Sequence, residues 1–418
     1  MTADAQTLVA RARQAAAALR VLPTEEKNRA LAALADALEA DSRALVGASA
    51  ADVAEARAAG QRPALIDRLA LTDDRVRAMA HGVRRVAALP DPVGETLEMR
   101  TMPNGMRVGR MRVPIGVILM IYEARPNVTI DAAALCVKAG NAAILRGGRE
   151  ARRANALLGE LLDRSGLPPG AVQVIADSDH VLVRELLRSD GIDLAIPRGG
   201  EGLIRSVVEH ARMPVLKHYK GACHLFVDRE ADLAMAGRLV LNAKTNRPST
   251  CNALETVLVD RPVAGAFVPD MIRALRAAGV EIRADAPTRA IAAEADAALG
   301  RELIPATDAD WGAEYLDLIL AVRTVDGFDE AVAHIQRYST GLADAIVTEN
   351  RTRAQRFLAA VDSAAVLVNA STRLVDGGEF GLGAEIGIST DRVGPRGPMG
   401  LAELTSLKWI VLGTGQIR

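Results

Sequence analysis

The sequence is poor in aromatic side chains and has almost no net charge. Aromatic residues make up 3% of its 418 residues, and 51 basic side chains nearly balance 52 acidic ones. Proteins that bind single-stranded nucleic acid need a basic groove with aromatic side chains on which bases stack, and anionic membranes attract basic patches. We therefore expect neither nucleic acid nor a membrane as a partner.

Disulfide and metal-ligand patterns are also missing. The three cysteines have no paired spacing, and the six histidines are scattered without an H-E-x-x-H or similar pair. An odd number of cysteines does not suggest a disulfide framework and is typical of a reducing compartment. The sequence opens without a basic and apolar secretion signal, and its longest apolar run, residues 113–122, is too short to span a bilayer. We predict no metal site and a cytoplasmic protein.

One polar stretch, residues 242–256, holds a cysteine at its middle. A helix-like run at 231–241 precedes it and a strand-like run at 256–259 follows it. Most cysteines outside disulfides are small buried hydrophobes, but the polar neighbours of Cys251, among them Lys244 and Arg247, do not fit a core strand. A loop cysteine near cations can be held partly as thiolate, the form that attacks carbon. We interpret Cys251 as a candidate nucleophile.

The rest of the chain indicates an α/β protein. Residues 1–90 have helical periodicity, with helix starts predicted at Thr24 and Thr72, and an Asn104-Gly105 turn predicts a hairpin within 91–110. Strand-like and helix-like runs then alternate, which predicts a parallel sheet covered on both faces. The first such strands are expected at 115–122, 142–145, 172–176 and 192–196. A second α/β domain begins near Gly221, and a strand at 407–411 could pair with another subunit.

Several of the predicted strands are followed by residues with binding chemistry. Loops after parallel strands line the ligand crevice of such folds. Asn127 offers an amide to a developing oxyanion, or else caps the next helix. Arg146 suits a nucleotide phosphate or ribose, or else lies in solvent, and Gly199 and Gly200 form a phosphate turn or a plain connection. Arg373 could pair with a substrate carboxylate.

Taken together, these stretches resemble the aldehyde dehydrogenase superfamily and, within it, the γ-glutamyl phosphate reductase family. The resemblance covers essentially the whole chain, through motifs at residues 121–129, 137–148, 242–245, 247–256, 379–389 and 396–401. It implies an aldehyde dehydrogenase-like α/β fold with three parts. These are a Rossmann-like cofactor domain at 1–90 and 111–221, a second α/β catalytic domain at 222–395, and an oligomerisation hairpin and tail at 91–110 and 396–418.

The resemblance also implies a reaction. This is the NADPH-dependent reduction of L-glutamyl 5-phosphate to L-glutamate 5-semialdehyde, with release of phosphate through a cysteine thioester, in proline biosynthesis. Cys251 matches the nucleophile and Asn127 the side-chain donor to the oxyanion. The positions that match contacts of NADP(H) are Arg146, Gly199, Gly200 and Glu314.

The stretch at 216–221 distinguishes this sequence from hydrolytic aldehyde dehydrogenases. Those enzymes carry a glutamate here that activates water, whereas this sequence has no carboxylate in the stretch. Lys217 and Arg247 would instead favour a phosphate leaving group, and we count them with Arg373 as candidate substrate-binding residues. The sequence departs from the family at Asn246, where glutamine is expected, and at Leu342, where histidine is common.

Two other functions stay open at this point. One is a dehydrogenase of the same fold that acts on another acyl phosphate or an acyl-CoA. The other is a catalytically silent nucleotide-binding or scaffold protein, in which Cys251→Ala would change nothing. The family resemblance favours a small-molecule substrate, a homo-oligomer (dimer or tetramer) and a functional link to glutamate 5-kinase.

Overall fold

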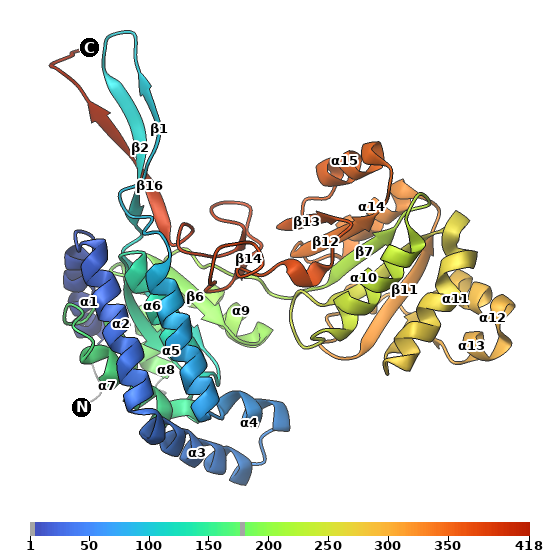
Figure 1. The fold of residues 1–418 in the computed structure, drawn as a ribbon, viewed down its shortest axis with the longest axis horizontal. Coiled ribbons are helices and arrows are strands. Elements are labelled where there is room, and N and C mark those ends of the chain that lie inside the picture. Colours follow the sequence, from blue (N-terminus) through green and yellow to red (C-terminus); the bar gives the residue numbers. More distant parts are fainter. Residues whose placement is uncertain (1–4, 176–179) are drawn as a thin grey trace. The chain divides into compact units, whose positions relative to one another are not determined.

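The computed structural model describes residues 5–175 and 180–418 (Figure 1). The last residue of the strand predicted over 172–176 therefore lies outside the described residues. The chain divides into two compact units, each described by itself below. The first unit comprises Met1–Lys217, Gly381–Gly387 and Met399–Arg418, and the second comprises His218–Phe380 and Ile388–Pro398.

Five helices open the first unit, as the helical periodicity predicts. They are α1 (Ala5–Leu19), α2 (Thr24–Ala40), α3 (Ser42–Ala58), α4 (Pro63–Leu69) and α5 (Asp73–Ala88). The hydroxyl of Thr72 caps α5 by accepting from the backbone N–H of Arg75 at 3.2 Å. The predicted helix start at Thr24 is confirmed, since α2 begins there, but the Thr24 hydroxyl does not cap this helix and instead donates to Asp91 at 2.8 Å.

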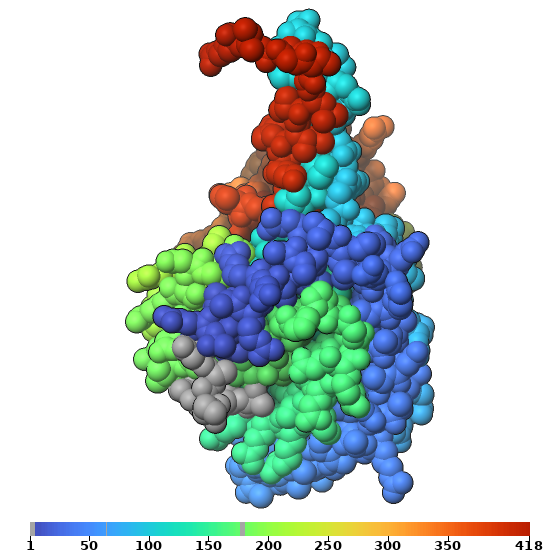
Figure 2. Space-filling model, turned by 90° about the vertical axis from the view of Figure 1, so that its left-hand side faces the viewer, coloured from blue at the N-terminus to red at the C-terminus, as the bar shows by residue number. Residues whose placement is uncertain are grey.

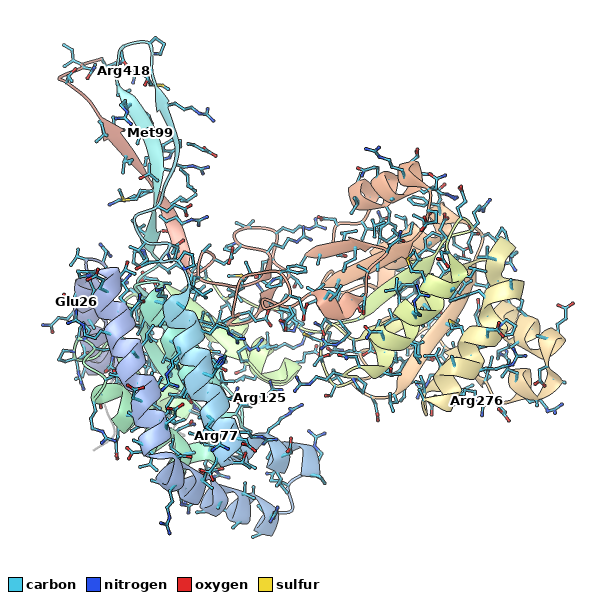
Figure 3. The ribbon with its side chains drawn as sticks, in the orientation of Figure 1. Glu26, Arg77, Met99, Arg125, Arg276 and Arg418 are labelled. Atoms are coloured by element: carbon cyan, nitrogen blue, oxygen red, sulfur yellow. The ribbon has the colours of Figure 1, made fainter. Side chains whose placement is uncertain are left out.

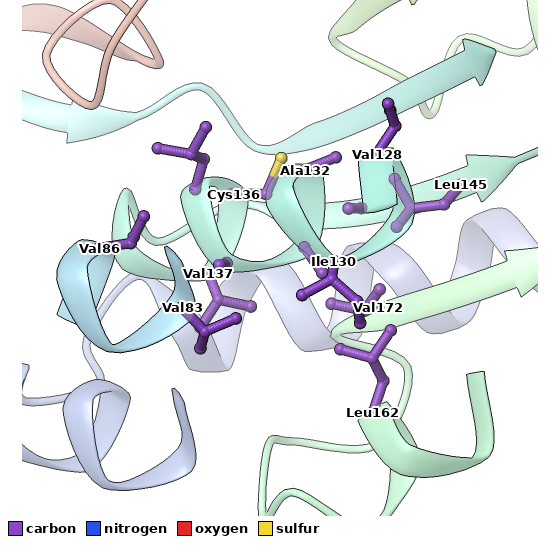
Figure 4. Close-up of a cluster of buried hydrophobic side chains, with 14 of the residues drawn as sticks. Val83, Val86, Val128, Ile130, Ala132, Cys136, Val137, Leu145, Leu162 and Val172 are labelled. Atoms are coloured by element: carbon purple, nitrogen blue, oxygen red, sulfur yellow. The ribbon is translucent and has the colours of Figure 1, made fainter. Parts of the chain in front are cut away.

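A parallel sheet forms the centre of the first unit. Its strands, in the order β5-β4-β3-β6, are β5 (Val172–Ile175), β4 (Ala142–Arg146), β3 (Val117–Tyr122) and β6 (Leu194–Arg198). The helices that alternate with them are α6 (Pro126–Lys138), α7 (Arg152–Asp163), α8 (His180–Leu187) and α9 (Glu201–His210), with a short 3-10 turn at Arg149–Ala151. Apolar side chains of α6 pack against α5, α7 and the sheet (Figure 4). The predicted strand and helix alternation is confirmed here.

A three-stranded antiparallel sheet stands out from the same unit (Figure 2). Its strands, in the order β1-β2-β16, are β1 (Thr96–Thr101), β2 (Arg107–Pro114) and β16 (Thr405–Leu412). The turn between β1 and β2 contains Gly105 at φ 85°, as the Asn-Gly prediction requires. The tail strand pairs with β2 of its own chain and forms an edge of this sheet, so its pairing with another subunit stays a prediction. The C-terminus lies beside the hairpin turn, where Gln416 donates to the Asn104 carbonyl at 3.0 Å (Figure 3).

A seven-stranded parallel sheet forms the second unit. Its order is β10-β9-β11-β8-β7-β12-β13, and its strands are β7 (Cys223–Val227), β8 (Leu254–Asp260), β9 (Glu281–Ala284), β10 (Ile304–Pro305), β11 (Ile319–Val325), β12 (Ala343–Val347) and β13 (Ala365–Val368). Its helices are α10 (Leu233–Thr245), α11 (Arg261–Ala277), α12 (Ala286–Ala295), α13 (Ala297–Arg301), α14 (Phe328–Tyr338) and α15 (Arg351–Ala360), with a 3-10 turn at Thr372–Leu374. Two short strands, β14 (Ile388–Ser389) and β15 (Gly397–Pro398), pair beside it. The sequence patterns missed β9 and β10.

No helix among residues 5–175 and 180–418 is long and apolar enough to cross a bilayer. Within the same residues, no three His, Cys, Asp or Glu side chains gather in a way that could hold a metal ion.

Candidate active site

Cys251 lies in the loop that joins α10 to β8, at the amino end of the second unit's sheet. The cysteine is partly exposed, whereas the next residue, Asn252, is buried. The Asn252 amide donates to the carbonyl of Val375 at 3.0 Å. On the other side of the cysteine, the Thr250 hydroxyl donates to the Arg247 carbonyl at 2.8 Å. The loop therefore holds the residues around Cys251 while it leaves this side chain within reach of solvent.

Gly221 packs against the backbone of Cys251. A Cβ added at Gly221 would lie 1.7 Å from the carbonyl oxygen of Cys251 and 2.8 Å from its Cα, so the contact excludes every side chain. The Gly221 N–H donates to Oε1 of Glu314 at 2.9 Å. The thiol of Cys223 donates to the Cys251 carbonyl at 3.4 Å. The segment at 221–223 thus fixes the position of the Cys251 backbone, and Glu314 in turn holds Gly221.

The two other cysteines are structural. Cys136 and Cys223 are completely buried. Burial raises the pKa of the Cys136 thiol to about 12. Burial, together with nearby Asp344, raises the pKa of the Cys223 thiol well above its usual value. Both thiols therefore stay protonated near neutral pH, and Cys251 is the one cysteine that is partly exposed.

Two arginines lie close to the Cys251 loop. Arg373 donates to the side-chain oxygens of Asn246, at 3.3 Å, and of Asn252. Burial lowers the pKa of the Arg373 guanidinium, and nearby Arg247 lowers it further. Two cations near one another favour an anionic ligand between them. The structure thus brings together the predicted residues Cys251, Arg247 and Arg373, and it shows a partner for the unexpected Asn246.

The predicted residues of the first unit gather at the carboxyl edge of its sheet. Arg146 ends β4, Asn127 follows β3, and Gly199 and Gly200 follow β6. These strands are neighbours, because β3 pairs with both β4 and β6. Lys217, the last residue of this unit before the second begins, is partly exposed.

Asn127 is the second residue of α6, and Arg125 occupies the N-cap position. The alternative that Asn127 caps this helix is therefore wrong. Its exposed amide donates to Oδ2 of Asp131, one turn further along, at 3.1 Å. Burial raises the pKa of the Asp131 carboxyl. The helix holds the amide in one orientation at the sheet edge.

The glycine turn at the start of α9 already holds a carboxylate. The Gly200 N–H donates to Oε2 of Glu123 at 3.1 Å. A Cβ at Gly199 would lie 2.7 Å from the same oxygen, so a side chain at this position would displace the Glu123 carboxylate. Helix N-termini favour negative charge, and this turn accepts an anion in the form of Glu123. Sequence reasoning missed Glu123, although it stands two residues before Arg125 in the same loop.

Comparisons with known proteins agree with this arrangement. The profile of the aldehyde dehydrogenase family matches residues 1–298. The γ-glutamyl phosphate reductase of Moorella thermoacetica is 53% identical over 99% of this chain and 99% of its own length. That of Caldanaerobacter subterraneus subsp. tengcongensis is 51% identical over 98% of each chain. The chain belongs to the γ-glutamyl phosphate reductase family.

Solved structures bear out the family and its fold. The crystal structure of γ-glutamyl phosphate reductase from Thermotoga maritima covers all of this chain at 43% identity, with a TM-score of 0.95. An acetylating aldehyde dehydrogenase from Geobacillus thermoglucosidasius has a TM-score of 0.68 at 17% identity, which shows the shared fold alone. The predicted aldehyde dehydrogenase-like fold is therefore confirmed.

Proposed function

We propose that this chain reduces L-glutamyl 5-phosphate to L-glutamate 5-semialdehyde with release of phosphate, a step of proline biosynthesis. The observation that carries the proposal is the Cys251 loop. It presents a partly exposed thiol beside Arg373 and Arg247, in a chain about half of whose residues match γ-glutamyl phosphate reductases.

The reaction begins with the Cys251 thiolate. It attacks the 5-carbonyl carbon of the acyl phosphate. The bond between this carbon and the phosphate oxygen then breaks, so phosphate departs and the acyl group stays on the sulfur as a thioester. NADPH, when bound, supplies the hydride that turns this acyl group into the aldehyde. The carbon–sulfur bond then breaks, and Cys251 is returned as thiolate. We assign the Asn127 amide and the Cys251 backbone N–H as donors to the oxyanion formed in these steps.

The cations hold the two ends of the substrate. Arg247 and Lys217 bind the phosphate that leaves, and Arg373 binds the carboxylate of the amino acid head. Asn246 and Asn252 support this role, because they hold the Arg373 guanidinium beside the Cys251 loop. The stretch at 216–221 contains no carboxylate to activate water, so the thioester is protected from hydrolysis.

The first unit binds the cofactor. Gly199 and Gly200 face its pyrophosphate, and Arg146 contacts one of its riboses or phosphates. Glu314, which belongs to the second unit, is assigned to the nicotinamide ribose. The glycine turn fits this use, because its N–H already pairs with the negative charge of Glu123. The preference for NADP(H) follows from the family.

A homo-oligomer, a dimer or tetramer, assembles through the antiparallel sheet. The edge strand β16 exposes Leu407, Trp409 and Val411, which alternate with other residues and so share one face. An exposed apolar face of this kind marks a protein interface. The acyl phosphate substrate is reactive, so a functional link to glutamate 5-kinase, which would supply it, follows from the same proposal.

The test is an assay in the oxidative direction. Glutamate semialdehyde is offered with NADP and phosphate, and Cys251→Ala is run beside the unchanged chain. We expect phosphate-dependent formation of NADPH that the variant abolishes. Activity with coenzyme A in place of phosphate would indicate an acyl-CoA enzyme, and activity that survives in Cys251→Ala would refute the proposal.

A further inference from the structure

A buried ion pair joins the two ends of the Cys251 loop. The ammonium of Lys244 lies 2.6 Å from Oε2 of Glu255, and both side chains are 0% exposed. Lys244 belongs to the last turn of α10, before the loop, and Glu255 is the second residue of β8, after it. A single interaction therefore spans the segment that carries the cysteine.

The same pair also reaches a third segment. The second carboxylate oxygen of Glu255 accepts from the backbone N–H of Leu316 at 3.4 Å. The Lys244 ammonium lies 6.0 Å from the ring centre of Tyr315, over its face. Leu316 has φ 56°, a backbone conformation that a leucine keeps only where its surroundings hold it. The segment at 314–316 is thus held by contacts that include this ion pair.

This third segment leads back to the cysteine. Glu314 accepts the N–H of Gly221 at 2.9 Å, and Gly221 packs against the Cys251 carbonyl. The contacts form a closed path from Lys244 and Glu255, through Glu314 and Gly221, to Cys251. A displacement of the ion pair would therefore shift both ends of the Cys251 loop and also the Gly221 backbone that packs against it.

Stability alone does not account for such a pair. Both side chains are 0% exposed, so both charges lose their hydration, and this burial lowers the pKa of Lys244 and raises the pKa of Glu255 to about 7. The loss of hydration offsets much of the attraction, so an apolar pair of similar size is often as stable. What the ion pair adds is a fixed geometry between helix, strand and loop.

We propose that Lys244 and Glu255 are positioning residues for the Cys251 nucleophile. They touch neither substrate nor cofactor and act by fixing the loop and the Gly221 backbone beneath it. The inference rests on the proposed function, since it concerns the placement of the thiolate at the acyl carbon. A displacement of about 1 Å at a reacting group lowers the rate by about 100-fold.

The experiment compares three variants. Lys244→Met leaves the Glu255 carboxylate unpaired on β8, whereas Lys244→Met with Glu255→Leu removes both charges. The matched control is Arg229→Met, which leaves the buried Asp260 unpaired at the far end of the same strand, roughly 20 Å from its start. The measurements are kcat and KM in the phosphate- and NADP-dependent assay and Tm. The number of thiols that react with iodoacetamide gives the number of intact active sites, because Cys136 and Cys223 are buried and only Cys251 is accessible to the reagent.

We expect Lys244→Met and Arg229→Met both to have a lower Tm than the unchanged chain, since each leaves a buried carboxylate unpaired. Only Lys244→Met loses kcat, by about 100-fold per reactive thiol, with KM within about threefold. The double variant recovers Tm but not kcat, because leucine cannot accept from the Leu316 N–H. A purely structural pair would instead let kcat recover together with Tm, and that result overturns the proposal.

A further variant covers poor folding of the double variant. Glu255→Gln keeps an acceptor for Leu316 and a partner for Lys244, so we expect kcat per reactive thiol to stay within about fivefold of the unchanged chain, against about 100-fold for Glu255→Ala. Equal kcat values in the two variants would also overturn the proposal. The unchanged chain and Cys251→Ala run in parallel, and an inactive unchanged chain would mean that the proposed function has failed and not this inference.

Discussion

Replacement of Gly221 by alanine tests how tightly the nucleophile is placed. The added Cβ would meet the Cys251 carbonyl oxygen at 1.7 Å, far below the 3.0 Å that real Cβ contacts respect. Because the backbone fixes the position of the Cβ and the carbonyl belongs to the backbone, no side-chain rotation can relieve the clash, and the Cys251 loop must move by about 1 Å or more. A shift of this size costs about 100-fold in rate, which corresponds to about 2.7 kcal/mol in the barrier. Overpacking also lowers the free energy of unfolding, by about 1–3 kcal/mol.

The assay is the phosphate- and NADP-dependent oxidation of glutamate semialdehyde, with kcat expressed per reactive thiol. The matched control is Gly237→Ala in α10, where an added Cβ meets nothing within 4 Å. The control should keep the kcat of the unchanged chain and gain a little stability, because alanine favours a helix more than glycine does. If Gly221→Ala turned over within about threefold of its control, the close contact with Cys251 would have no part in catalysis.

Three further predictions follow from the same structure. Arg373→Met should lower kcat/KM by about 10–100-fold, mainly through KM, because it removes charge-assisted hydrogen bonds to the substrate, and steady-state kinetics measures it. Burial, with nearby His224 and Arg323, lowers the pKa of His334 to about 3. In the unfolded chain the imidazole of His334 binds a proton near pH 6.5, whereas in the folded chain it stays neutral. Protonation therefore favours the unfolded chain, so the free energy of unfolding is highest above pH 6.5 and decreases as the pH falls below it. As the pH falls from 6.5 to 5, the free energy of unfolding measured in urea should decrease by about 2 kcal/mol, and His334→Gln should not show this decrease. Trp409→Ser should weaken self-association by about 30-fold, as seen by light scattering at a series of concentrations, because it removes a large apolar side chain from the exposed edge.

Much of the fold follows from hydrophobic periodicity. Long amphipathic helices show a clear 3.6-residue period, and the buried strands β3 and β8 show as short apolar runs whose length and alternation with helices indicate a parallel sheet. The short strands β9 and β10 were missed because four and two residues carry too little pattern. Thr24 shows a different limit, since a local capping signal was overridden by Asp91, far away in the sequence.

The candidate site was predictable where its chemistry is local. The polar neighbours of Cys251 and the residues after strands are visible in the sequence itself. Contacts between distant segments are not: Gly221 needs to be glycine because of a backbone thirty residues away, and Glu123 meets Gly200 only in the folded chain. A weaker signal was present for Glu255, whose acidic side chain stands inside an apolar strand and thereby indicates a buried partner.

The antiparallel sheet has a consequence for biosynthesis. Its third strand contacts the second across about 290 residues of sequence, as the bond from Arg112 to Thr405 illustrates. At ordinary rates of translation, of about 5–20 residues per second, the hairpin waits roughly 15–60 s on the ribosome before that strand emerges. During this interval the open edge of β2 is exposed to other nascent chains. Assembly of subunits through this sheet must therefore follow the completion of each first unit, and slower translation would lengthen the period in which the edge can pair wrongly.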